Sequence, residues 1–264
     1  TDVLMLGCYD GNKNTATLMN IPRDTCVEIN GKHRKINSAY SHGKEEGLLA
    51  CIEDTLGIKP DYYFVVGLDA FRSIVDLVGG VEVDVPFDMN YDDSSQGLSI
   101  HLKKGLQTLN GAQAEGFVRY RKGYADADLG RIRAQQAFMT SLFKKCLSFN
   151  NWTKIPQMMQ TVLGNKNINT NIGLDDALSL AKMALNLDME NVQMLTEPSE
   201  PCSYQGESFV SFYEDEMLEV LNKYFNLYKT PLTSKDTNII EISKEYANIY
   251  GNTEGTSMGE IDEN

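Results

Sequence analysis

The chain has 264 residues and a mass of 29.5 kDa, which is enough for one large domain or two small ones with a proper hydrophobic core. Its formal net charge of −13 argues against nucleic acid as a partner, because neutralising phosphates along DNA or RNA requires a basic surface. The five cysteines have no CxxC spacing and histidines number three, so the pattern argues against a zinc or iron–sulfur site while leaving room for one disulfide.

The first predicted element is a β-hairpin. Residues 3–6 and 16–21 are apolar runs, and residues 10–14 between them are rich in turn formers. Asp10 is therefore interpreted as a turn residue. A strand with nothing before it is an unusual start for a domain, so we expect that residues preceding Thr1 are missing from this sequence.

Helical and strand patterns alternate after the hairpin. Helices are predicted at residues 47–56, 69–77, 110–120, 129–149, 156–163, 174–187 and 213–228. Strands are predicted at residues 62–66, 81–85 and 192–195, with the first of these buried and a polar loop at 88–99. This order predicts a single three-layer α/β/α domain over residues 1–230, with a mixed central sheet covered by helices on both faces.

The C-terminal segment, residues 231–264, has a different composition. From residue 235 onward two lysines stand against seven carboxylates, with Gly, Ser, Thr and Asn between them. Such a polar, acidic segment buries too little apolar surface to fold, so we expect a disordered tail.

Two basic islands interrupt the acidic background. Arg119 to Arg133 holds five basic and two acidic residues, and Arg23 to Lys35 holds four basic and two acidic residues. Local positive charge on an acidic protein favours a focused site for an anionic ligand, although two solvated faces with weak surface ion pairs would give the same counts.

The spacing of the basic residues favours the ligand site. Arg119 and Arg121 flank Tyr120, so in an extended segment their side chains point the same way. Arg131 and Gln135 are four residues apart on a predicted helix that begins near Asp128, so they share one face. A planar guanidinium group can donate two parallel hydrogen bonds to two phosphate oxygens. Asp128 has two possible roles, as the residue that caps the helix or as a proton acceptor among the arginines.

Several short motifs follow one another over the first 140 residues. In the first half they are Thr1-Asp2-Val3-Leu4-Met5, Ile21-Pro22-Arg23-Asp24-Thr25 and Lys35-Ile36-Asn37-Ser38-Ala39-Tyr40. In the second half they are Leu109-Asn110-Gly111, Arg119-Tyr120-Arg121, Asp128-Leu129-Gly130-Arg131-Ile132 and Gln135-Gln136. Each motif alone is weak evidence, but the ordered set resembles, in order and spacing, the motifs of a LytR-CpsA-Psr domain.

The resemblance implies an extracytoplasmic, membrane-anchored phosphotransferase of bacteria that moves a polyprenyl (pyro)phosphate-linked glycopolymer onto peptidoglycan. By that similarity Arg23, Arg119, Arg121, Arg131 and Gln135 would hold the pyrophosphate, with Lys35 at the edge of the pocket. Asp128 would orient Arg131 or accept a proton, and catalysis would depend on it together with Arg23, Arg119 and Arg121. Membrane attachment would come from an anchor before Thr1, because the sequence holds no run near the roughly 18 apolar residues of a membrane span.

Metal binding is a further implication of the resemblance. Asp2 would contribute to a Mg²⁺ site, and Mg²⁺ accepts one or two carboxylates together with phosphate oxygens. The second aspartate of the family motif would lie upstream of Thr1. A non-catalytic module that binds polyprenyl phosphate is therefore the alternative function, and a transcription attenuator is disfavoured by the charge and by the lack of a helix-turn-helix pattern.

Overall fold

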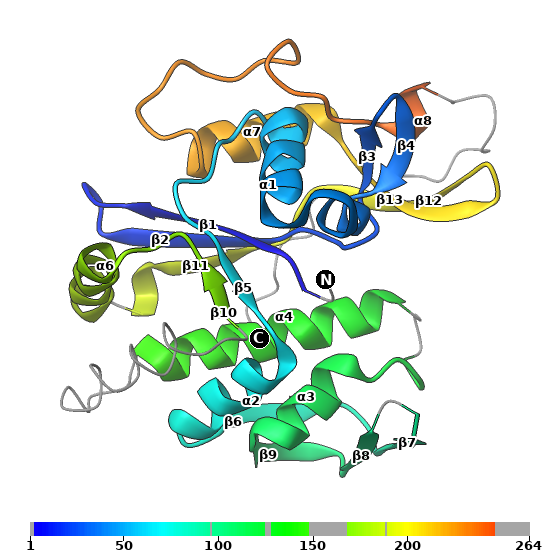
Figure 1. Cartoon of the computed structure of the whole chain (residues 1–264), viewed down its shortest axis with the longest axis vertical. Coiled ribbons are helices and arrows are strands. Elements are labelled where there is room, and N and C mark those ends of the chain that lie inside the picture. Colours follow the sequence, from blue (N-terminus) through cyan, green and yellow to red (C-terminus); the bar gives the residue numbers. More distant parts are fainter. Residues whose placement is uncertain (1–2, 96, 125–127, 148–167, 188, 246–264) are drawn as a thin grey trace. The chain divides into compact units, whose positions relative to one another are not determined.

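The computed structural model describes residues 3–95, 97–124, 128–147, 168–187 and 189–245 (Figure 1). The chain divides into two compact units. The first contains residues 1–61 and 192–264, and the second contains residues 62–191. The second unit is thus an excursion of the chain between two segments that fold together.

The predicted N-terminal hairpin is confirmed. Strand β1 (Met5–Asp10) pairs antiparallel with β2 (Thr15–Asn20), and β11 (Val192–Leu195) pairs parallel with β2 on its other side. Asp10 is the last residue of β1 and pairs with Thr15, and its carboxylate accepts hydrogen bonds from the backbone N–H groups of the turn residues Asn12 and Lys13 at 3.0 and 3.2 Å. The side chain of Asp10 therefore supports the turn as predicted, whereas its backbone belongs to the strand.

The rest of the first unit packs around this sheet and two further hairpins. These elements are β3 (Cys26–Ile29) with β4 (Lys32–Lys35), α1 (Asn37–Leu56), β12 (Ser199–Tyr204) with β13 (Glu207–Phe212), α7 (Glu214–Tyr224) and the short α8 (Ile242–Glu245). Its core includes the fully buried Met19, Leu56 and Phe212.

The described part of the C-terminal segment is packed rather than free. Ile240 and Ile242 are buried, and the Ser211 hydroxyl accepts a hydrogen bond from the Ile242 backbone N–H at 2.9 Å. The Asn222 side chain likewise accepts one from the Leu232 backbone N–H at 2.7 Å. Residues 231–245 therefore differ from the predicted disordered tail because their isoleucines complete an apolar cluster. Residues 246–264 lie outside the described part.

In its described residues the second unit has three two-stranded sheets and most of the long helices. Its sheets pair β5 (Phe64–Val66) with β10 (Ile168–Thr170), β6 (Val81–Val85) with β9 (Gly105–Leu109), and β7 (Met89–Asp93) with β8 (Leu98–Leu102). Its helices are α2 (Leu68–Leu77), α3 (Gly111–Arg119), α4 (Asp128–Leu147), α6 (Leu174–Asn186) and the short 3-10 helix η2 (Met189–Asn191). Phe117 and Phe138 join α3 and α4 in one apolar core.

Two local predictions are wrong in this unit. The polar stretch predicted as a loop at 88–99 contains β7 and the start of β8, because Leu98, Ile100 and Leu102 alternate with polar residues and bury one face. The strand predicted as buried at residues 62–66 exposes Phe64 and Val66 by 53% and 42%, and its three-residue part, β5, pairs with β10 in a two-stranded sheet rather than lying inside a larger one. The helix predicted at 156–163 lies outside the described residues.

The molecule mixes helices and strands as predicted. Among the described residues the strands form six small sheets, of which the largest has three strands. The single mixed central sheet and the three-layer arrangement therefore stay predictions.

Candidate functional site

The first group of predicted site residues lies in the first unit, where the chain leaves β2. Thr25 and Asp24 are held through the backbone, since the Ile36 N–H donates to the Thr25 carbonyl and the Val210 N–H donates to the Asp24 carbonyl, both at 2.9 Å. The Thr25 hydroxyl also donates to the Pro22 carbonyl at 2.7 Å. The backbone that carries Arg23 is thus fixed on both sides.

Arg23 and Lys35 meet at one carboxylate. The Asp24 Oδ1 atom lies 3.3 Å from Lys35 Nζ and 3.8 Å from Arg23 Nε. All three side chains are about one-third exposed, and Lys35 Nζ also lies 5.8 Å from the ring centroid of Phe209. The structure therefore brings two predicted phosphate-binding cations together with a local charge of +1.

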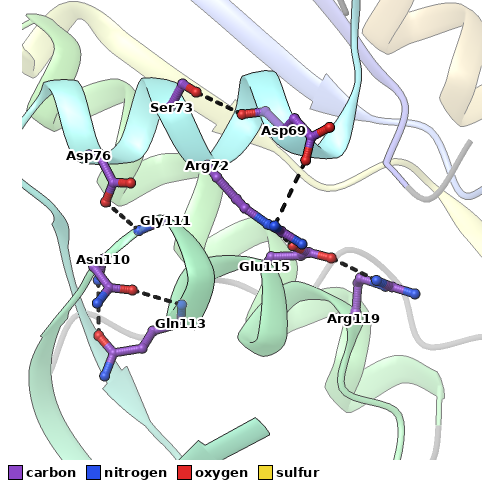
Figure 2. Close-up of polar contacts among 9 residues, drawn as sticks. All are labelled: Asp69, Arg72, Ser73, Asp76, Asn110, Gly111, Gln113, Glu115 and Arg119. Carbon is purple, nitrogen blue, oxygen red and sulfur yellow. Dashed lines mark hydrogen bonds and ion pairs between the residues drawn. The ribbon is translucent and has the colours of Figure 1, made fainter. Parts of the chain in front are cut away.

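The second group lies in the second unit, beginning at the C-terminal end of α3. A capping box starts this helix, in which Asn110 and Gln113 bond each other's backbone N–H groups at 3.0 Å (Figure 2). Arg119 is the last residue of the helix, and its Nη1 atom donates to Oε1 of Glu115 at 2.6 Å (Figure 2). Glu115 is 2% exposed, so this charged pair is shielded from water.

The backbone becomes extended at Tyr120, the residue after α3, and the side chains on either side of Tyr120 point away from the core. Tyr120 is buried in the apolar core of the unit, whereas Arg119 is 18% exposed and Arg121 is exposed. Arg119 is helical rather than extended, so part of the predicted alternation is replaced by the end of α3. The two arginines still leave the core on either side of Tyr120.

The predicted helix bearing Arg131 and Gln135 is confirmed as α4. Arg131 is 7% exposed, which is unusual for arginine. The Gln135 amide donates to the Val118 carbonyl at 2.6 Å, next to Arg119 in the chain. Gln135 thereby joins α4 to the end of α3, and its predicted contact with pyrophosphate stays a prediction.

An aromatic cluster supports the segment between α3 and α4. The Phe87 ring lies 6.0 Å from Tyr120 and 5.0 Å from Tyr124, between ring centroids. Gly123 has φ +81° and a Cβ there would lie 3.0 Å from Phe87, so this position requires glycine. Burial, with a smaller effect of Tyr120, raises the pKa of Tyr124 to about 12 against an opposing effect of Arg131, so Tyr124 stays protonated at neutral pH.

The carboxylates of the predicted site are not described. Asp2 lies outside the described residues, and Asp128 is the first residue of α4 with its side chain outside the described part. Among the described residues, no group of three or more His, Cys, Asp or Glu side chains could hold a metal ion. The predicted Mg²⁺ site therefore depends on a residue that the structure does not describe.

Sequence reasoning missed Glu115 and its second partner, Arg72 of α2. The Arg72 Nε atom donates to Oε2 of Glu115 in a very short contact (Figure 2). The spacing of Glu115 and Arg119, four residues apart with the acid first, was a readable signal for a helical ion pair. The Arg72 contact joins residues 43 apart in the chain, so no local pattern indicated it.

The described helices include none that is both long enough and apolar enough to cross a membrane.

Several curated proteins are similar in sequence to this chain. The chain is 30% identical over 246 residues to the polyisoprenyl-teichoic acid–peptidoglycan teichoic acid transferase TagV of Bacillus subtilis strain 168, which covers 90% of this chain and 62% of the relative. It is 36% identical over 176 residues to the regulatory protein MsrR of Staphylococcus aureus, covering 65% of this chain and 51% of the relative. The chain thus spans about half to three-fifths of the length of these curated relatives.

Solved structures share the fold. The crystal structure of TagV from B. subtilis matches with a TM-score of 0.72 at 26% identity, covering 86% of this chain and 90% of that one. Protein gbs0355 from Streptococcus agalactiae matches with a TM-score of 0.82 at 22% identity, covering 96% of this chain and 89% of that one. The model of the LytR_cpsA_psr family matches residues 1–226, most of the chain. The chain therefore belongs to the LytR_cpsA_psr family.

Proposed function

We propose that this protein is a phosphotransferase that moves a glycopolymer from a polyprenyl (pyro)phosphate carrier onto peptidoglycan. The observation that carries the proposal is the match to TagV, a named teichoic acid transferase, over 90% of this chain. Two clusters of cations support it. Arg23 and Lys35 share the Asp24 carboxylate, and in the second unit the buried Glu115 carboxylate pairs with two arginines, with only the water-screened Asp69 beside them, so each cluster keeps positive charge for an anion.

The proposed reaction is an exchange at phosphorus. A hydroxyl oxygen of peptidoglycan forms a bond to the phosphorus atom that carries the glycopolymer. The bond from that phosphorus to the bridging oxygen of the pyrophosphate breaks, and polyprenyl phosphate leaves with the bonding electron pair. The hydroxyl proton must pass to a base, for which we propose Asp128, the first residue of α4.

The arginines would stabilise the negative charge that builds up on the leaving phosphate. Arg121 is exposed beside the supported Tyr120–Tyr124 segment, and Arg119 is oriented by Glu115. Arg131 and Gln135 would act from α4, and Arg23 and Lys35 are proposed as further ligands of pyrophosphate.

Mg²⁺ is proposed as a cofactor, held by Asp2 together with phosphate oxygens of the ligand. A single aspartate fits this chemistry, because Mg²⁺ keeps several waters and is bound through one or two carboxylates plus phosphates. When bound, Mg²⁺ would neutralise charge on the pyrophosphate. We place the activity outside the cytoplasm at the cell membrane, where carrier and peptidoglycan meet.

The experiment measures release of polyprenyl phosphate from a pyrophosphate-linked glycopolymer incubated with peptidoglycan fragments. Arg121→Ala should lower the rate about 100-fold or more, the size expected for loss of a charge-stabilising donor, with little change in the free energy of unfolding. Arg133→Ala is the matched control, because Arg133 is also an exposed arginine and lies on α4 outside the proposed site.

Carrier binding without transfer by the unmodified chain would instead support the non-catalytic binding module. Equal losses in Arg121→Ala and Arg133→Ala would contradict a specific role for Arg121.

For the metal, calorimetric titration should show Mg²⁺ binding that is weak alone and at least tenfold tighter with inorganic pyrophosphate. Tight Mg²⁺ binding without pyrophosphate would contradict the single-aspartate site.

A further inference from the structure

We infer that Glu115 is a positioning residue for Arg119. Arg72 binds the same carboxylate and supplies a second positive charge, so that the three residues together stay cationic. The inference deepens the proposed function and rests on it, since it concerns how one pyrophosphate-binding arginine is oriented. The three residues Arg72, Glu115 and Arg119 are called the α2–α3 triad below.

The geometry of the triad assigns one carboxylate oxygen to each arginine. Oε1 of Glu115 accepts from Arg119 Nη1 at 2.6 Å, and Oε2 accepts from Arg72 Nε (Figure 2). A carboxylate with both oxygens engaged has little freedom to rotate. Arg119 is therefore held through its Nη1 atom at the end of α3.

The backbone brings the two helices close enough for this contact. A Cβ at Gly111 would collide with the backbone of Arg72, so a larger residue there would force α2 and α3 apart. The Asp76 carboxylate accepts a hydrogen bond from the Gly111 N–H at 2.7 Å and fixes the same approach (Figure 2). The triad thus spans a tightly packed junction between two helices.

The charge count explains why two arginines are present. A buried Glu115–Arg119 pair alone would be neutral and would offer an anion little attraction. Arg72 raises the net charge of the triad to +1, while the nearby Asp69 lies 3.8 Å from Arg72 and is 73% exposed, so water screens it. Arg119 is then oriented by Glu115, while the triad keeps a positive charge that attracts a phosphate oxygen.

The two arginines keep the buried Glu115 carboxylate charged. Burial alone raises the pKa of Glu115, but the hydrogen bonds and charges of Arg72 and Arg119 outweigh it and hold the pKa below its ordinary value. Glu115 is therefore ionised throughout the neutral pH range, and the triad acts as a fixed feature of the site.

The test measures binding of inorganic pyrophosphate to this chain by calorimetry. Glu115→Gln raises the charge of the triad from +1 to +2, so a purely electrostatic role predicts tighter binding. The positioning role predicts binding about tenfold weaker, with most of the affinity kept in Glu115→Asp. Arg72→Met should weaken binding about fivefold, and because Arg72 is 42% exposed this variant carries the test if Glu115→Gln does not fold.

A double-mutant cycle separates positioning from general support of the fold. If Glu115 acts through Arg119, Glu115→Gln should weaken binding no further once Arg119→Ala is present. Asp76→Asn is the matched control, because Asp76 joins α2 to α3 through Gly111 without contacting an arginine of the triad, and its effect should add to that of Arg119→Ala.

Unchanged or tighter pyrophosphate binding by Glu115→Gln, or effects that add in the first cycle, would overturn the inference while leaving the proposed function standing. Absence of pyrophosphate binding by the unmodified chain, with Mg²⁺ present, would overturn the proposed pyrophosphate site and the inference with it. Binding by the unmodified chain that is lost in Glu115→Gln and coupled to Arg119 is the expected result.

Discussion

Two buried glutamates, one in each unit, differ in their surroundings. Glu115 is 2% exposed and Glu197, which follows β11, is 7% exposed. Both oxygens of Glu115 accept hydrogen bonds from arginines, and its pKa lies below the ordinary value. Burial raises the pKa of Glu197 to about 7 against weaker opposing hydrogen bonds from its own backbone and from Ser199, and Oε2 has no hydrogen-bond partner in the described part of the chain.

The comparison shows that the hydrogen-bond partners of a buried carboxyl group, rather than its degree of burial, decide whether it is charged. Removing an ion from water costs several kcal/mol, and this cost is offset where two guanidinium groups replace the lost water. Glu115 is therefore suited to hold a cation in place, whereas Glu197 is a carboxyl that the first unit tolerates best when protonated. Similar burial thus has opposite consequences for stability as pH changes.

The largest effect is expected for Glu115→Gln at pH 8. The change leaves two arginines without their shared charge, so we expect a loss of about 3 kcal/mol in the free energy of unfolding, measured with urea. Because the pKa of Glu115 is lowered by folding, its contribution is present above the ordinary pKa of 4.5 and declines as pH falls through the folded value.

The control for this prediction is Asp76→Asn, which removes the charge of another carboxylate at the α2–α3 junction. It should cost less, since Asp76 bonds a backbone N–H and no arginine of the triad. Equal losses for the two variants would show that helix packing, rather than the paired charges, sets the stability of this junction.

A smaller effect of opposite sign is expected for Glu197→Gln. Folding raises the pKa of Glu197 from 4.5 to about 7, so the stability of the unmodified protein falls as pH rises between these values and is level above them. Glutamine mimics the protonated acid, and we expect a gain of about 2 kcal/mol at pH 8 that disappears near pH 4.

Urea unfolding at both pH values measures the effect of Glu197→Gln. An equal gain at pH 4 and pH 8 would mean that packing of the amide, rather than the loss of a buried charge, stabilises the variant. Destabilisation at pH 8 would contradict the raised pKa itself.

Much of the second unit was predictable because its elements carry strong local signals. The period-two pattern of Val81–Val85 and the apolar stripe of α2 correspond to the observed β6 and α2. The hairpin β7–β8 was missed although Leu98–Leu102 alternates in the same way, because the polar residues before it dominate the composition. In the described part of this unit the strands have three to five residues and form two-stranded sheets, so they hold no long apolar strand for a pattern to reveal.

The candidate site was predictable as a set of residue types and only partly as a geometry. The sequence predicts Arg119 near the end of one helix and Arg131 on the next, and the structure has these residues on α3 and α4. The carboxylate that orients Arg119 is local, but its second partner, Arg72, is brought in by packing of α2 on α3. Contacts set by packing between helices have no periodic signal in a single sequence.

The smallest effect is expected for Asp24→Asn in the first unit. Asp24 also joins two cations, but it is 27% exposed and lies 3.3 and 3.8 Å from Lys35 and Arg23, so water and salt screen the interaction. Exposed pairs of this kind contribute less than about 1 kcal/mol, and the loss should disappear in 1 M salt. The backbone hydrogen bond between Asp24 and Val210 remains in the variant, so the local fold should persist. A loss of unfolding free energy as large as that of Glu115→Gln would contradict the link between the burial of an ion pair and its strength. It would also assign Asp24 the same orienting role toward Arg23 that Glu115 has toward Arg119.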